Sequence, residues 1–296
     1  MLRKNSFYLI LFLNFNIIFS IHAFSNQLQK PKNIILFIGD GMGPSQITAA
    51  RICAHTSRGS LKMEQLPITG FVKTYSESDF VTDSAAAATA LASGTKTYNG
   101  AIGIKRTSQG VKYNYQELET LVDIANRQNK KTGLITTTSI THATPAAFYA
   151  HVTHRSQQDT IAKQLLMSKL DLALGGGRDW FYPYSWQDPI TGEQGKRNDN
   201  RNLINEIKKK KWEYLDERDA LKKANKNKKI LGLFAYKHLK NSLDHDKKYD
   251  KQPTLVELVD FAINRFAKDK NGYFLMIEGG RVDHAAHNND TKNMLG

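Results

Sequence analysis

The stretch Asn33-Ile34-Ile35-Leu36-Phe37-Ile38-Gly39-Asp40-Gly41-Met42-Gly43 is an apolar run that ends in a glycine-rich loop. A continuous run with β-branched residues is typical of a strand buried on both faces of a parallel sheet. A helical pattern follows from Pro44 to about Ala54. This order predicts an α/β fold in which ligands gather at the carboxyl ends of strands.

The same alternation continues along the chain. Further strands are predicted at 71–75, 132–138, 172–174 and 272–277. Helices are expected at 83–93, 115–128, 160–168, 255–268 and 291–296. Strands that alternate with helices indicate a mostly parallel central sheet with helices on both faces, which is a three-layer sandwich.

Composition limits the class of protein. The 296 residues contain 40% apolar and 24% charged residues, which is ordinary for a folded domain and excludes a disordered or collagen-like chain. The single cysteine, Cys53, excludes an internal disulfide framework and a cysteine-rich zinc module. We expect Cys53 to be a small buried residue of the first helix.

The N-terminus has the features of an export signal. Arg3 and Lys4 precede an apolar stretch from Phe7 to about Ile21, and Ala23-Phe24-Ser25 fits a cleavage site. The alternative, a membrane anchor, is disfavoured because the stretch is short for a span and contains two asparagines. We therefore expect a signal peptide at 1–25, a folded portion at 26–296, no stable membrane anchor, and a secreted or periplasmic location.

The net charge of +14 is concentrated in one segment. Residues 196–251 contain 18 Lys and Arg against 9 Asp and Glu, a net of +9 (18 − 9). The segment contains no recognisable nucleic-acid-binding motif. We interpret it as a Lys-rich solvated surface and expect no nucleic-acid partner.

Two short motifs carry candidate chemistry in the first half of the chain. Asp40 lies between glycines directly after a strand, where its carboxylate could bind a divalent cation, although such loops are often simple tight turns. Ser84 lies at the start of an alanine-rich helix. Its hydroxyl could cap that helix, or it could attack phosphorus with help from the helix dipole and the free N–H groups.

Two later motifs complete the candidate site. His142-Ala143-Thr144-Pro145 places a hydroxyl suited to a hard cation after a strand, and Arg155 has a planar guanidinium that matches two phosphate oxygens. Glu278 follows the last strand, and Asp283 and His287 are four residues apart on one helical face. A carboxylate with an imidazole suits Zn²⁺, whereas Glu278 suits Mg²⁺.

Together these motifs resemble the alkaline phosphatase family of metal-dependent phosphomonoesterases. The resemblance rests on GDGMG around Asp40, VTDSAAAATALASGTKTYNG around Ser84, HATPAAFYAHVTHR around Thr144, and EGGRVDHAAH from Glu278. It extends in order from about Asn33 to the end of the chain. It implies an α/β sandwich around a long sheet, two Zn²⁺ and one Mg²⁺ per subunit, and a homodimer.

The resemblance also implies a role for each residue. Ser84 would be the nucleophile that becomes phosphoserine and a zinc ligand, and Arg155 would hold the phosphate of small phosphate monoesters. The metal ligands would be Asp40, Thr144, Glu278, Asp283 and His287. Asp83, His142 and His284 would act through neighbouring groups rather than as metal ligands.

The chain departs from the family pattern at its C-terminal side. The family has an Asp-His pair and a further His well beyond the EGGRVDHAAH segment, and these complete its zinc sites. This sequence stops at Gly296, so we interpret it as an N-terminal portion with an exposed sheet edge. Two functions stay open: a phosphatase, or a non-catalytic remnant that binds Mg²⁺ or phosphate. A sulfatase or phosphodiesterase is disfavoured by the surroundings of Ser84 and by Arg155.

Overall fold

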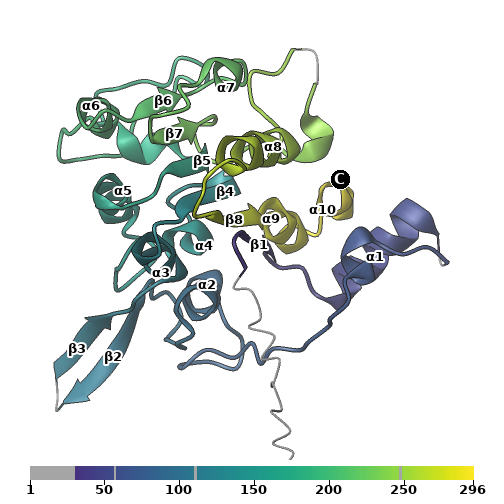
Figure 1. Ribbon diagram of the computed structural model, residues 1–296. Helices are drawn as coiled ribbons and strands as arrows, with labels where there is room; N and C mark the ends of the chain where they lie inside the picture. The colour runs from purple at the N-terminus through teal and green to yellow at the C-terminus, as the bar shows by residue number, and fades with distance from the viewer. Residues whose placement is uncertain (1–30, 57, 110–111, 247–248) are drawn as a thin grey trace, which may run out of the picture. The chain divides into compact units, whose positions relative to one another are not determined.

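A parallel six-stranded sheet forms the centre of the protein. The computed structural model describes residues 31–56, 58–109, 112–246 and 249–296 (Figure 1), so the predicted signal peptide lies outside the described residues. The strand order is β1-β8-β4-β5-β7-β6, and all neighbouring pairs are parallel. In that order the strands are Ile34–Gly39, Tyr273–Gly279, Lys131–Ser139, Leu172–Gly176, Ile230–Leu233 and Glu213–Leu215.

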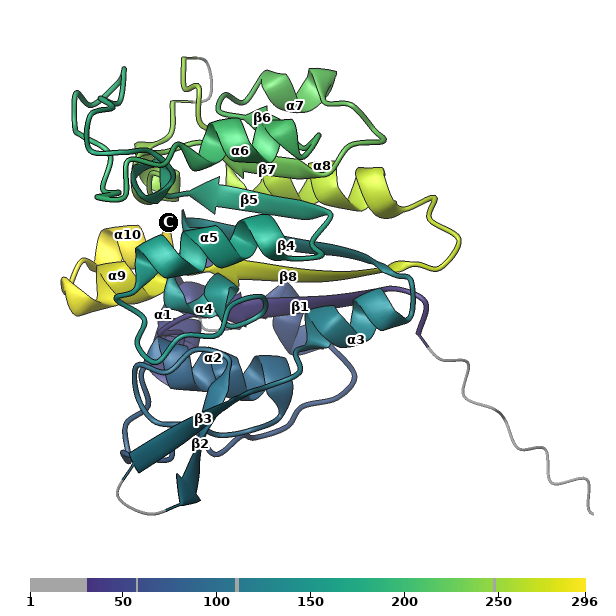
Figure 2. The same cartoon turned by 90° about the vertical axis from the view of Figure 1, so that its left-hand side faces the viewer.

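Helices cover both faces of this sheet (Figures 1 and 2). One face packs against α2 (Ser84–Ser93), α3 (Leu121–Arg127), α4 (Ala143–Ala146), α5 (Gln158–Met167) and α6 (Leu203–Lys209). The other face packs against α7 (Ala220–Lys223) and α8 (Leu255–Phe266). The predicted three-layer α/β sandwich is confirmed.

Local signals explain where the helices begin and end. Thr254 caps α8 in a reciprocal pair with Glu257, and Pro253 precedes it. Gly94 ends α2 in the left-handed conformation, with φ +70°. The remaining helices are α1 (Pro44–His55), α9 (Arg281–His287), α10 (Thr291–Leu295) and the 3₁₀ turns Lys62–Gln65, Arg178–Phe181 and Ser242–Asp244.

Two of the predicted elements are wrong. Residues 71–75 form no strand and are exposed, and their backbone pairs with none of the described strands. The helix predicted at 115–128 begins only at Leu121, since Thr120 and Asp123 form its capping pair. The preceding residues form an antiparallel hairpin, β2 (Ile104–Gln109) and β3 (Lys112–Glu117), that sequence reasoning missed.

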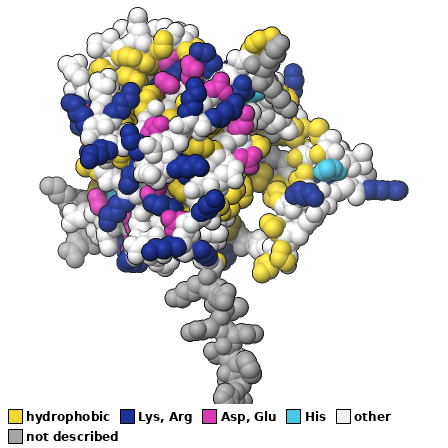
Figure 3. Space-filling view, turned by 45° about the horizontal axis from the view of Figure 1, so that its top comes forward, with side chains coloured by type: hydrophobic (Ala, Val, Ile, Leu, Met, Phe, Trp, Pro, Cys, Tyr) yellow, Lys and Arg dark blue, Asp and Glu magenta, His cyan; other side chains and the backbone are white. Residues whose placement is uncertain are grey.

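The burial predicted for the first strand is also wrong. β1 lies at the edge of the sheet and pairs only with β8 in the described structure. Leu36 and Ile38 pack against the core, whereas Phe37 on the opposite face is 67% exposed. The helix α1 that follows has no buried residue, so Cys53 is exposed rather than buried. In Figure 3, apolar side chains are visible on the right-hand side of the molecule, where α1 lies.

No helix among the described residues combines the length and apolar character that crossing a bilayer requires.

Candidate active site

The carboxyl ends of three neighbouring strands bring candidate ligands together. Asp40 follows β1, Glu278 lies near the end of β8, and His142 follows β4. The strand register sets Ile38 and Thr136 on either side of Glu278. Potential ligand atoms of Asp40, His142 and Glu278 all lie within 4.8 Å of one another. Among the described residues, these three form the group of His, Cys, Asp or Glu side chains that is close enough to hold a metal ion.

Glu278 is held in a fully buried position between two threonines. Thr136 Oγ1 donates to its Oε2, and Thr138 Oγ1 lies 3.3 Å from the same oxygen. Burial raises the pKa of Glu278 to about 7, although the hydroxyls of Thr136 and Thr144 act in the opposite direction. Its Oε1 has no hydrogen-bond partner among the described residues. A buried carboxylate oxygen without a donor fits a cation ligand.

Asp40 experiences the same kind of environment. Burial raises its pKa, and the nearby carboxylate of Asp283 raises it further. The hydroxyl of Ser84 and the guanidinium of Arg155 lower it. Two partly buried carboxylates near each other favour a bound divalent cation, because a cation would stabilise both in their charged forms.

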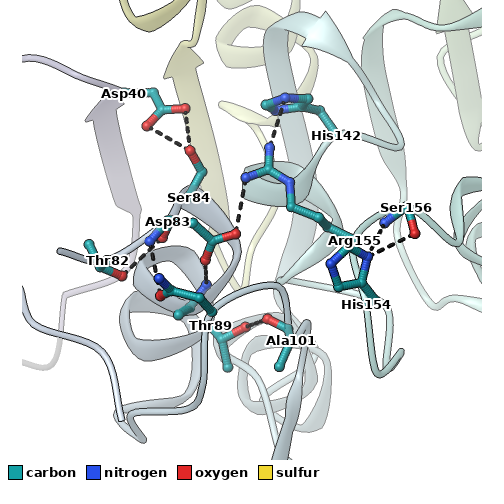
Figure 4. Close-up of polar contacts among 12 residues, drawn as sticks. Asp40, Thr82, Asp83, Ser84, Thr89, Ala101, His142, His154, Arg155 and Ser156 are labelled. Carbon is teal, nitrogen blue, oxygen red and sulfur yellow. Dashed lines mark hydrogen bonds and ion pairs between the residues drawn. The ribbon is translucent and has the colours of Figure 1, made fainter. Parts of the chain in front are cut away.

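Ser84 is the first residue of α2 and lies against Asp40 (Figure 4). Its Oγ donates to Asp40 Oδ2 at 3.0 Å and lies 3.2 Å from Oδ1. The helix is capped by Asp83 instead, whose Oδ1 accepts the N–H of Ala86 at 2.9 Å. The capping interpretation of Ser84 is therefore wrong, and its hydroxyl is available at the helix N-terminus.

Arg155 reaches the same space from the segment after α4. Its Nη1 lies 3.2 Å from Asp83 Oδ2, and its Nη2 lies 3.1 Å from His142 Nε2 (Figure 4). Since an arginine nitrogen always donates, His142 Nε2 accepts and Nδ1 carries the proton in the neutral ring. Burial and Arg155 lower the pKa of His142 to about 3, so the ring is neutral at physiological pH.

Asp283 and His287 lie on α9 at the open side of this site. Gly41 fixes the approach of the Asp40 loop to α9, because it has φ +65° and a Cβ there would lie 2.7 Å from Asp283 Oδ1. His287 Nε2 lies 3.4 Å from Asp283 Oδ1, as their spacing predicts, but the His287 side chain is 80% exposed. Within the described residues these two side chains have no third ligand of the kinds that zinc uses.

Sequence reasoning missed His238, which completes a cluster of three imidazoles. The ring centroids of His238 and His284 are 4.6 Å apart, and His142 lies 5.8 Å and 5.4 Å from them. His238 Nδ1 accepts the N–H of Ser139 at 3.0 Å, and burial lowers its pKa to about 3. The available signal was position, because His238 follows β7 at the ligand-bearing edge.

The structure thus brings most predicted site residues together. Asp40, Ser84, Asp83, Arg155, His142 and Glu278 form one contiguous group, joined by the contacts described above. Thr144 is buried in α4 near Glu278. His284 lies against His142, and Arg281 Nη1 donates to its Nδ1 at 3.0 Å. His287 is the most exposed of the predicted site residues discussed above, and its Nε2 lies near Asp283.

Known proteins are similar to this chain in sequence. "Repressible alkaline phosphatase" of Saccharomyces cerevisiae is 38% identical over 298 residues, covering 92% of this chain and 50% of its own length. "Alkaline phosphatase 4" of Bacillus subtilis is 39% identical, covering 88% and 53%. The chain therefore spans about half the length of the curated relatives it matches.

Solved structures give the same result. Alkaline phosphatase from the Antarctic bacterium TAB5 superposes with a TM-score of 0.74 at 32% identity, covering 90% of this chain and 70% of its own. The Thermus thermophilus enzyme has a TM-score of 0.75 at 31% identity, covering 89% and 53%. A histidine-to-aspartate mutant of the TAB5 enzyme was solved with Mg bound in its M3 site. Residues 31–296 match the alkaline phosphatase family, and the chain belongs to it.

Proposed function

We propose that this chain provides the nucleophile, phosphate-binding and magnesium-binding parts of an alkaline phosphatase that hydrolyses small phosphate monoesters. The observation that supports this most directly is the hydrogen bond between Ser84 and Asp40 at the N-terminus of α2. A serine hydroxyl next to a carboxylate at a helix N-terminus combines a nucleophile with N–H groups that stabilise phosphoryl oxygens.

Each of these residues has a role in the proposed reaction. Ser84 Oγ attacks phosphorus, which releases the alcohol and leaves a phosphoserine that water then hydrolyses. Arg155 binds the phosphoryl oxygens with its guanidinium, and Asp83 orients that guanidinium through their 3.2 Å contact. Because these groups recognise only phosphate, selectivity for the alcohol should be low.

Metal ions fit the carboxylates and imidazoles around Ser84. Asp40, Thr144 and Glu278 would hold Mg²⁺, and Ser84, Asp283 and His287 would contribute to two Zn²⁺ sites. When bound, these ions would lower the pKa of the attacking hydroxyl and stabilise the leaving oxygen. The unpartnered Glu278 Oε1 and the raised pKa of Asp40 support cation binding at this place.

The test is hydrolysis of p-nitrophenyl phosphate by the purified chain with Zn²⁺ and Mg²⁺. Ser84→Ala should lower kcat by at least about 10³-fold, since removing a nucleophile removes the whole covalent path. Ser93→Ala is the matched control, because Ser93 lies at the other end of α2, where its hydroxyl donates to the carbonyl oxygen of Thr89 and accepts the N–H of Thr95. Mass spectrometry of acid-quenched enzyme should find phosphate on Ser84.

The alternative function is cation or phosphate binding without turnover. It is favoured by the open side of the site, where Asp283 and His287 have no further described ligand. Absence of zinc-dependent hydrolysis by the wild-type chain, together with retained Mg²⁺ binding, would reject the phosphatase proposal for this polypeptide and support the alternative.

The proposal also includes where the protein is located and whether it forms a dimer. Export with cleavage near Ser25, a secreted or periplasmic location and a homodimer are expected from the sequence and from the family. Protein sequencing of the N-terminus after expression, and sedimentation of the purified chain, would test them.

A further inference from the structure

Eleven of the 30 lysines of this chain lie at the edge of the sheet opposite the candidate active site. All six strands are parallel, so their amino ends lie at one edge, on the right in Figure 2. The six segments that lead into these strands are 31–34, 129–131, 167–172, 210–213, 224–230 and 267–273. Each contains lysine, and together they contain Lys32, Lys130, Lys131, Lys169, Lys210, Lys211, Lys226, Lys228, Lys229, Lys268 and Lys270. We call this set the amino-edge lysine face.

Contacts between the segments make this a continuous surface. Lys130 Nζ donates to the carbonyl oxygen of Lys32 at 2.6 Å and to that of Asn271 at 3.1 Å, which joins the starts of β4, β1 and β8. Lys229 Nζ lies 3.2 Å from the carbonyl oxygen of Lys169, which joins the starts of β7 and β5. The fold therefore collects residues that are far apart in sequence.

The charge of this face is largely uncompensated. The six segments contain eleven lysines and three carboxylates, Asp171, Glu213 and Asp269, a net of +8 (11 − 3). Asp171 pairs with Lys131 at 3.1 Å. Lys210 and Lys229 donate to backbone carbonyls, which leaves their charge in place.

Several of these lysines project into solvent without a carboxylate partner. Lys169, Lys211, Lys228 and Lys270 are exposed and form no ion pair with any described residue. Figure 3 shows many Lys and Arg side chains, with fewer Asp and Glu side chains between them, on the body of the molecule. A positive field of this kind attracts an extended anionic partner.

We propose that the amino-edge lysine face binds the surface of an anionic lipid bilayer. The six segments contain no arginine, and flexible lysines suit diffuse attraction to a charged surface better than paired recognition of individual phosphates. Their aromatic residues, Trp212 and Tyr273, are buried, so the face has no stacking platform for single-stranded nucleic acid. These features favour lipid headgroups over RNA or DNA.

The orientation of the sheet is compatible with the same partner. A bilayer bound here would leave the carboxyl edge, with Asp40 and Glu278, facing the solution. The proposal does not rest on the phosphatase function.

The experiment is co-sedimentation of the full chain with vesicles of phosphatidylcholine alone or mixed with phosphatidylglycerol. We expect tighter binding to the anionic vesicles and a loss of that difference in high salt. The triple variant Lys169→Gln/Lys228→Gln/Lys270→Gln should weaken binding to anionic vesicles at least about tenfold, since each lysine near such a surface contributes roughly fivefold.

The matched control has the same net charge. Lys62→Gln/Lys237→Gln/Lys292→Gln removes three exposed lysines that lie outside the face, and it should bind almost as tightly as the wild type. Equal binding to both vesicle types, equal weakening in both triple variants, or charge-dependent binding to RNA but not to vesicles would each overturn the proposal. Circular dichroism melting checks that both variants fold.

Discussion

Glu278 and His287 are nine residues apart on consecutive elements, yet their environments are opposite. Glu278 is fully buried at the end of β8 and fixed by Thr136 and Thr138, whereas His287 on α9 is 80% exposed. The site therefore has a buried side, built on the strand ends, and an open side, built on one surface helix. Because only the buried side is held by neighbouring strands, the affinity of this chain for a cation should depend mainly on the residues of the buried side.

The first prediction concerns pH and has the largest expected effect. The pKa of Glu278 is raised from 4.5 to about 7, so the folded state keeps a proton that the unfolded state releases between these values. The free energy of unfolding of the metal-free chain should therefore fall by ~3 kcal/mol as pH rises through this window. Urea denaturation at pH 5 and pH 8 with a chelator measures it.

Glu278→Gln is the control for that measurement, since it cannot titrate and should remove most of the pH dependence assigned to this residue. Added Mg²⁺ should stabilise the wild type more at pH 8 than at pH 5, because it binds the charged carboxylate. If the free energy of unfolding changed by the same amount from pH 5 to pH 8 in the wild type and in Glu278→Gln, a raised pKa of Glu278 would be contradicted.

The second prediction compares the two sides directly. Glu278→Ala should lower the affinity for Mg²⁺ at least about 100-fold, since even groups that only support a ligand contribute 10–100-fold. His287→Ala should change it less than about tenfold, because its side chain lies in solvent. Isothermal titration with Mg²⁺ measures both, and equal losses would remove the distinction between the buried and open sides.

The third prediction tests the close contact between the Asp40 loop and α9, where the buried and open sides of the site meet. Gly41→Ala should lower the free energy of unfolding by ~2 kcal/mol or more, because φ is +65° and the added Cβ meets Asp283. Gly94→Ala is the matched control, with φ +70° but no atom within 4 Å of its Cβ. It should cost only about 1 kcal/mol. Similar losses in both variants would show that the Asp40 loop does not press against α9.

The fourth prediction concerns the helix start next to the buried side. Asp83→Ala should lower the free energy of unfolding by about 1 kcal/mol, because it removes the cap of α2. Asp83→Asn should lower the free energy of unfolding by only a few tenths of a kcal/mol, since asparagine also caps helices. It would still remove the ion pair with Arg155. Thermal melts of the two variants separate capping from charge, and a large loss in Asp83→Asn would assign the stability to the ion pair.

Sequence patterns predicted the elements that carry the site better than those around it. β4, β8 and α2 were found because their residues are buried or capped by local signals, as with Gly94. The strand at β1 was found, but its burial was misjudged, because an apolar run does not reveal whether a neighbour covers Phe37. Local pattern also cannot distinguish an edge strand from a central one.

Contacts between distant segments were the least predictable. His238 joins His142 and His284 only because β7, β4 and β8 end at one edge. No strand was predicted for β2, and the last residues of β3 were assigned to the helical pattern that continues into α3. The roles predicted for the site residues, as nucleophile, phosphate-binding group or metal ligand, all stay predictions.

The cap of α2 has a consequence for any covalent change at Ser84. Because Asp83 closes the first turn through the N–H of Ala86, the helix does not depend on the serine hydroxyl for its start. A group attached to Ser84 Oγ would replace its hydrogen bond to Asp40 but leave the helix start as it is. The scaffold can therefore stay the same while the side chain alternates between its free and modified forms.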